Sequence, residues 1–162
     1  MKQTIWKSCA AAALLLLAPL VSPAGAQTLS ESAGRPSAPA GTAHFTGTAW
    51  SEWYFRPEAL SRMYGALVTF APGARTHWHI HPLGQTLIVT SGTGYVQERG
   101  QAPVFIKPGD IIRSTPGVSH WHGASAGSIM SHIALSETGG TVTWEEAVSD
   151  EDYNKANEVH PS

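Results

Sequence analysis

The chain has 162 residues, of which 14% are charged and 42% hydrophobic, with a formal net charge of −2 and 1 cysteine. No run of Lys or Arg could neutralise a row of phosphates, which argues against nucleic acid as a partner. A single cysteine excludes an intrachain disulfide and any zinc or redox motif built on cysteine pairs. With 16 Gly and 11 Pro, the composition is typical of one domain of short strands and turns rather than of a helical bundle.

The first 26 residues have the pattern of a secretory signal peptide. Lys2 and Lys7 precede an apolar run over residues 9–21, and Ala24-Gly25-Ala26 forms a small-residue cleavage site. An uncleaved membrane anchor is the alternative, but the run is shorter than the roughly 20 residues that span a bilayer and prolines interrupt it. We therefore predict a secreted or periplasmic protein, cleaved after Ala26 and without stable membrane insertion afterwards.

The elements expected after residue 26 follow from composition and turn residues. Residues 27–43 are rich in Ser, Ala, Gly and Pro and predict a disordered leader. Residues 44–146 alternate β-branched or aromatic segments with Gly/Pro turns, which predicts an all-β sandwich or jelly-roll barrel. We expect ten strands, in chain order: Phe45–Phe55, Met63–Phe70, Thr76–His81, Gln85–Thr90, Gly94–Glu98, Val104–Lys107, Asp110–Ser114, His120–Gly123, Ser128–Ser136 and Thr141–Glu145. Residues 147–162 form a tail with a short helix, capped by Ser149 and acidic in its first turn.

Histidines gather in one part of the chain. Six of the eight lie within a short stretch: His77, His79, His81, His120, His122 and His132. Side chains two apart on a strand share a face, so His79 and His81 point together, as do His120 and His122. One such pair would be an ordinary strand feature, whereas two converging pairs indicate a divalent metal site. Gln85 opens the next strand, four residues after His81.

Two motifs around these histidines resemble those of the cupin superfamily. Residues 73–85 read GARTHWHIHPLGQ and close at Gly92, and residues 108–120 read PGDIIRSTPGVSH. Gln85 stands where most cupins have Glu, and Thr115 where the second motif usually has Pro. From about residue 44 to 153 the chain is similar to small bacterial cupins that include manganese-dependent (R)-selective hydroxynitrile lyases. The resemblance implies a single-domain cupin jelly-roll β-barrel with a short C-terminal helix.

The resemblance also implies a site. It places His79, His81, Gln85 and His120 as metal ligands, with His122 and His132 lining the pocket. Ala66 and Val68, which alternate onto one strand face, match its pocket-lining positions, although packing alone would explain them equally.

The expected donors are three imidazoles and an amide, so a divalent ion keeps its full charge and is a stronger Lewis acid. This suits proton-coupled lyase chemistry better than oxygen activation. The resemblance favours Mn(II), and the imidazole ligands also suit Fe(II), Zn(II) or Ni(II). His122 and His132 titrate near neutrality and are candidate acid–base residues. Alternatively, His132 only orients a ligand.

The leading hypothesis is an exported metal-dependent lyase that cleaves cyanohydrins reversibly to aldehyde and cyanide. The alternatives are an oxygen-dependent dioxygenase or alkene-cleaving cupin, and a non-catalytic cupin that binds a small molecule. The expected partners are a small-molecule substrate and further copies of the chain, as a homodimer or homotetramer, because exposed edge strands favour self-association.

Overall fold

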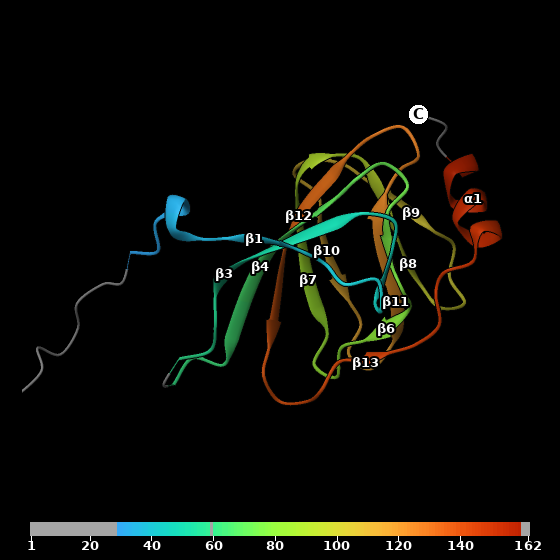
Figure 1. The fold of residues 1–162 in the computed structure, drawn as a ribbon. Helices are drawn as coiled ribbons and strands as arrows, with labels where there is room; N and C mark the ends of the chain where they lie inside the picture. Colours follow the sequence, from blue (N-terminus) through green and yellow to red (C-terminus); the bar gives the residue numbers. More distant parts are fainter. Residues whose placement is uncertain (1–28, 59, 160–162) are drawn as a thin grey trace, which may run out of the picture.

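The computed structural model describes residues 29–58 and 60–159 (Figure 1). The predicted signal peptide, Met1–Ala26, lies outside the described residues. Within the described part, no helix is both long and apolar enough to cross a membrane. Two antiparallel sheets lie face to face, and one helix packs on the outer side of the second (Figure 1).

The first sheet has six strands in the order β1-β3-β4-β12-β7-β10. Its strands are β1 (Ser37–Pro39), β3 (Ala49–Phe55), β4 (Met63–Phe70), β7 (Gln85–Gly92), β10 (Ile111–Ser114) and β12 (Met130–Glu137). β12 pairs with β4 on one side and with β7 on the other, so it forms the centre of this sheet.

The second sheet follows the order β13-β6-β11-β5-β2, with β8 pairing to β11 and to β9. Its strands are β2 (Phe45–Thr46), β5 (Arg75–Thr76), β6 (His79–Ile80), β8 (Gly94–Glu98), β9 (Val104–Ile106), β11 (Ser119–Ala124) and β13 (Thr143–Trp144). The helices are η1, a 3-10 turn at Ser32–Gly34, and α1, Asp150–Val159.

This architecture confirms the predicted all-β jelly-roll barrel with a short C-terminal helix. Two predicted strands, Met63–Phe70 and Gly94–Glu98, have the predicted bounds. The predicted strand Phe45–Phe55 instead divides into β2 and β3 at Gly47, which has φ +78° and lies so close to Ala74 that a Cβ would approach it to 3.0 Å. Thr76–His81 divides into β5 and β6 because the backbone N–H of Trp78 donates to the Glu146 carbonyl oxygen, in the loop between β13 and α1.

The predicted leader differs from expectation in its described part, because β1 pairs with β3 at the edge of the first sheet. Arg35 forms a 2.7 Å ion pair with Glu52, and its guanidinium lies over the ring of Tyr54. Composition predicted disorder because this segment buries almost nothing: every residue of β1 is exposed. Backbone pairing to an open edge strand requires no apolar side chains.

The core has two parts that decide where a site can form. One lies between the sheets, around Phe70, Val89 and Met130, and fills one end of the barrel. The other lies outside the second sheet, where α1 covers Trp121 and Tyr95. The remaining space between the sheets is the end at which the histidines gather.

Candidate metal centre

His79 and His120 come from neighbouring strands and face each other. β6 pairs with β11 in a register that puts His79 opposite His120, and the two ring centroids lie 4.3 Å apart. A tight turn after β6 then carries the chain to Gln85: at Gly84, φ is +79° and an added Cβ would lie 2.7 Å from the Ser114 carbonyl oxygen. Only glycine fits this turn without strain, so Gly84 helps to position Gln85.

Backbone carbonyls orient both imidazoles. The His79 Nδ1 lies 3.0 Å from the His77 carbonyl oxygen, and the His120 Nδ1 lies 3.1 Å from that of Val118. Since a carbonyl oxygen only accepts, each Nδ1 must donate its hydrogen. Each Nε2 therefore keeps a free lone pair, which is the usual arrangement of a histidine that binds a metal.

Gln85 adds an oxygen beside these nitrogens. Its Oε1 lies 3.3 Å from the His120 Nε2. With the Nδ1 of His120 protonated, the Nε2 and the amide oxygen are both acceptors, and two facing lone pairs repel unless a cation or proton lies between them. The residues present therefore fit a bound cation.

The tightest group consists of His79, His120 and His122, whose ligand nitrogens lie within 4.8 Å of one another, all three buried. The His81 ring centroid lies 5.3 Å from that of His79 and 5.8 Å from that of His120. The structure thus brings together His79, His81, Gln85 and His120, as the resemblance implied. It also places His122 closer to them than the sequence suggested.

His122 and His132 form a buried pair. The His132 Nε2 lies 3.0 Å from the His122 Nδ1, and both rings contact Phe70. The outer nitrogens, His122 Nε2 and His132 Nδ1, are buried and have no hydrogen-bond partner among the described residues. An orphaned, buried His122 Nε2 beside two other imidazoles again fits a site that holds a cation or a substrate.

Burial keeps these histidines neutral at physiological pH, so the expectation that His122 and His132 titrate near neutrality is wrong. Desolvation, reinforced by the neighbouring His120, lowers the pKa of His79 to about 3. Desolvation likewise lowers the pKa of His81 and of His132 to about 4 and that of His122 well below its usual value. Neutral imidazoles are the form that binds divalent metals.

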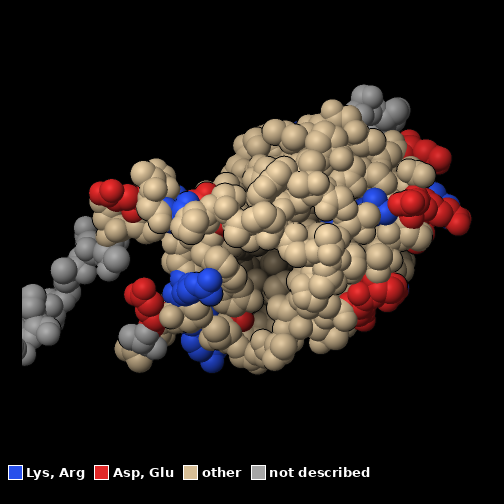
Figure 2. All heavy atoms as spheres, viewed as in Figure 1, with Lys and Arg blue, Asp and Glu red and all other residues tan. Residues whose placement is uncertain are grey.

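An apolar cavity of about 220 Å³ adjoins the cluster. His79, His81, Gln85 and His122 contribute to its wall, as do the two predicted pocket residues, Ala66 and Val68. His132 stands behind His122 and reaches the cavity only through it. The aromatic residues in the wall of the cavity are Phe45, Trp53, Tyr64 and Trp144. The face drawn in Figure 2 is hollowed near its centre, with mostly uncharged residues around the hollow.

Sequence reasoning missed Trp144. Its ring lies between His79, at a centroid distance of 4.8 Å, and His44, at 4.2 Å. β13 pairs Trp144 with His79, although six other strands lie between them in the chain, so no local pattern could have indicated this contact. Trp78 and Trp121, which neighbour two of the site histidines in sequence, pack away from the site in the cluster under α1.

Comparison with known proteins agrees with this geometry. Residues 66–132 match the family model described as a cupin domain. The chain is 49% identical over 113 residues to a protein named (R)-mandelonitrile lyase from Granulicella tundricola, an alignment that covers 68% of this chain and 86% of the relative. The chain belongs to the cupin family. As a cupin with a three-histidine cluster, it has a site suited to a divalent metal.

Solved structures extend the comparison. A cupin-like protein from Thermotoga maritima is 40% identical, with a TM-score of 0.71, and the match covers 73% of this chain and 91% of that one. A cupin-2 domain from Rhodospirillum rubrum has a TM-score of 0.63 at 14% identity, covering 82% of this chain and 93% of that one, and supports the fold alone.

Proposed function

We propose that this cupin is a metal-dependent carbon–carbon lyase that cleaves cyanohydrins reversibly to an aldehyde and cyanide. The observation that carries the proposal is the likeness to a protein named (R)-mandelonitrile lyase together with an apolar cavity that ends on neutral histidines. A cavity of about 220 Å³ with aromatic walls suits an aromatic cyanohydrin, whose ring gains from apolar burial.

His79, His81, Gln85 and His120 are the ligands in this proposal, and Mn(II) is the proposed ion. When bound, a divalent ion would act as a Lewis acid that lowers the pKa of a nearby hydroxyl. Because the four donors carry no charge, they leave that effect undiminished. A carboxylate in the position of Gln85 would reduce the Lewis acidity of the ion.

His122 is the proposed base. In the tautomer whose Nδ1 carries the proton, His122 donates from Nδ1 to the His132 Nε2. The lone pair of the His122 Nε2 is then directed to the cavity. The His122 Nε2 takes the proton of the cyanohydrin hydroxyl. The bond between the carbinol carbon and the nitrile carbon then breaks, and the electron pair of that bond leaves with cyanide. Since burial lowers the pKa of His122, its imidazolium is a stronger acid than that of a free histidine and gives the proton to water after cyanide has left. His132 positions His122 through the 3.0 Å hydrogen bond.

The test is an assay on mandelonitrile with manganese-loaded and iron-loaded protein, each with and without oxygen. We expect metal-dependent release of benzaldehyde and cyanide at a rate that oxygen does not change. No release with either metal would contradict the lyase function. Product formed only in the presence of oxygen would point to a dioxygenase instead.

We also propose that the protein is exported, on the pattern of Met1–Ala26. N-terminal sequencing of protein recovered from outside the cytoplasm is expected to begin at Gln27. An exported chain that still begins at Met1 would count against cleavage.

A further inference from the structure

A second cavity, of about 360 Å³, lies at the end of the first sheet, where β7 begins and β10 and β12 end. Leu83, Thr86, Arg113 and Thr115 are among the residues of its wall. Gln85 and Ser136 line both this cavity and the apolar one beside the histidines. These two side chains therefore form part of the boundary between the two cavities.

The second cavity is polar where the first is apolar. Ser114 and Ser136 are 5% and 6% exposed and line it, and neither hydroxyl has a hydrogen-bond partner among the described residues. Arg113 has no carboxylate within ion-pair distance in the described part of the chain. The carboxylate in the wall, Glu137, lies 3.7 Å from Arg62, which offsets its charge. Two free hydroxyls and an unpaired guanidinium are groups that bind a small anion or water.

We propose that this polar cavity is a second route to the metal centre, used by small anions and water, while the apolar cavity takes the organic part of the substrate. Ser136 and Gln85 form the passage between the two, and Arg113 attracts the anion at the outer end. That the physiological anion is cyanide rests on the proposed lyase function. The route itself depends only on the geometry of the two cavities.

A separate route has a physical reason. The two fragments of a cyanohydrin differ, since the aldehyde is apolar and cyanide is small and charged. Moving an unpaired anion through an apolar cavity costs its hydration energy. A path lined by hydroxyls replaces part of that hydration, and a guanidinium at its outer end raises the local anion concentration.

Thiol labelling tests the route without any assay of activity. The sequence has 1 cysteine, Cys9, so a Cys9→Ser background makes an introduced thiol the sole target. Ser136→Cys and Ala134→Cys are matched probes on one face of β12, because both positions line the apolar cavity and only 136 also lines the polar one. Methanethiosulfonates modify a thiol by forming a mixed disulfide and releasing methanesulfinate. The anionic probe is the 2-sulfonatoethyl reagent, and the neutral probe is the benzyl reagent.

We expect the anionic reagent to modify Ser136→Cys about tenfold faster than Ala134→Cys, and the benzyl reagent to show no such preference. Adding Arg113→Gln to Ser136→Cys is expected to slow the anionic reagent about threefold and to leave the benzyl rate unchanged. Equal rates of the anionic reagent at the two positions, or no effect of Arg113→Gln, would overturn the proposal.

If Ser136→Cys does not fold, as judged by circular dichroism, Ser114→Cys serves instead, since it lines the polar cavity and not the apolar one. The same preference for the anionic reagent is expected there. A protein that labels as expected but does not cleave mandelonitrile would retain the route and lose the lyase function, so the two failures are distinguishable.

Discussion

Single atoms decide the chemistry of this site. The Nδ1 atoms of His79 and His120 donate to backbone carbonyls, whereas the Nδ1 of His122 faces another imidazole. A carbonyl can only accept, so it fixes one tautomer, but an imidazole can accept or donate. His122 is therefore the histidine of the tight group that can exchange a proton through its neighbour, and this separates its role from that of the proposed ligands.

Metal analysis of three variants tests this division of roles. We expect His81→Ala and His120→Ala to lose bound manganese, because each removes a proposed ligand. We expect His122→Ala to keep the metal and to lose about 10²- to 10⁴-fold in turnover, as for the removal of an acid–base group. The measurement is metal content per chain after dialysis, with the rate on mandelonitrile.

His77→Ala is the control, since it keeps the backbone carbonyl that orients His79 and removes a side chain outside the cluster. Metal-free His122→Ala would show that His122 is a ligand, as its place in the tightest group permits, and the proposed base would be wrong.

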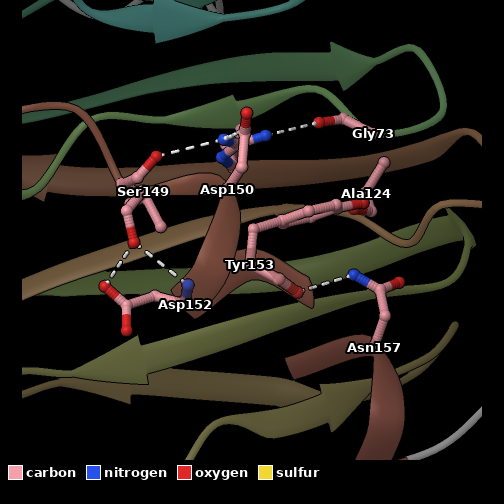
Figure 3. Close-up of polar contacts among 9 residues, drawn as sticks. Gly73, Ala124, Ser149, Asp150, Asp152, Tyr153 and Asn157 are labelled. Carbon is pink, nitrogen blue, oxygen red and sulfur yellow. Dashed lines mark hydrogen bonds and ion pairs between the residues drawn. The ribbon is translucent and has the colours of Figure 1, made fainter. Parts of the chain in front are cut away.

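Strand β11 joins the site to the rest of the protein. Its His120 and His122 face the barrel interior, while Trp121 between them is fully buried on the other side, next to Tyr153 of α1. The Tyr153 hydroxyl donates to the Ala124 carbonyl oxygen at 2.8 Å (Figure 3). The Arg75 guanidinium lies over the Tyr153 ring. α1 therefore supports from outside the strand that carries two of the site histidines.

The start of α1 provides a test of this support. The Ser149 hydroxyl accepts from the Asp152 backbone N–H at 3.0 Å and donates to the Asp152 carboxylate (Figure 3). Ser149→Ala removes this cap and is expected to lower the free energy of unfolding by about 1 kcal/mol, measured by urea denaturation. Ser149→Asp keeps an acceptor and is expected to stay within about 0.5 kcal/mol of the original protein. Equal stability of both variants would mean that this cap does not hold the helix.

The whole barrel is closed at one end and open at the other. Apolar side chains around Phe70 fill the closed end, and the two cavities open at the end that carries the histidines. Five buried histidines lower the free energy of unfolding under acid conditions. The folded protein can accept protons on them only by placing charges in a desolvated site.

Metal-free protein is therefore expected to lose stability as the pH falls from 6.5 towards 4. The pKa of His81 and of His132 is about 4 in the folded protein and 6.5 when the side chain is free. The unfolded chain binds more protons between these values, so each such histidine lowers the free energy of unfolding by about 2 kcal/mol at pH 5. Well above pH 6.5 both states are neutral and this contribution is constant.

Urea denaturation of metal-free protein at pH 7.5, 6 and 5 measures the effect. His132→Leu is expected to show a weaker pH dependence, because it removes one of the titrating groups. Manganese is expected to move the loss of stability to lower pH, since protons and the metal compete for the same nitrogens. Equal stability at pH 7.5 and pH 5 would contradict the prediction.

The sequence alone determined the features that depend on local spacing. The period of two along a strand placed His120 and His122 on one face, and Gly and Pro marked the turns around them. The motif resemblance added Gln85 as a partner of both histidine pairs. Strand faces and turns could be predicted in this way because strand geometry and turn conformation are set by residues close together in the chain.

Only the tertiary structure decided the features that depend on pairing between distant segments. β13 brings Trp144 onto His79, β1 joins the edge of the first sheet, and Ser136 reaches the boundary between two cavities. The close approach of His122 to His79 belongs to the same group. Strand order and side-chain direction across a closed barrel are set by long-range packing, and no local pattern of residues records them.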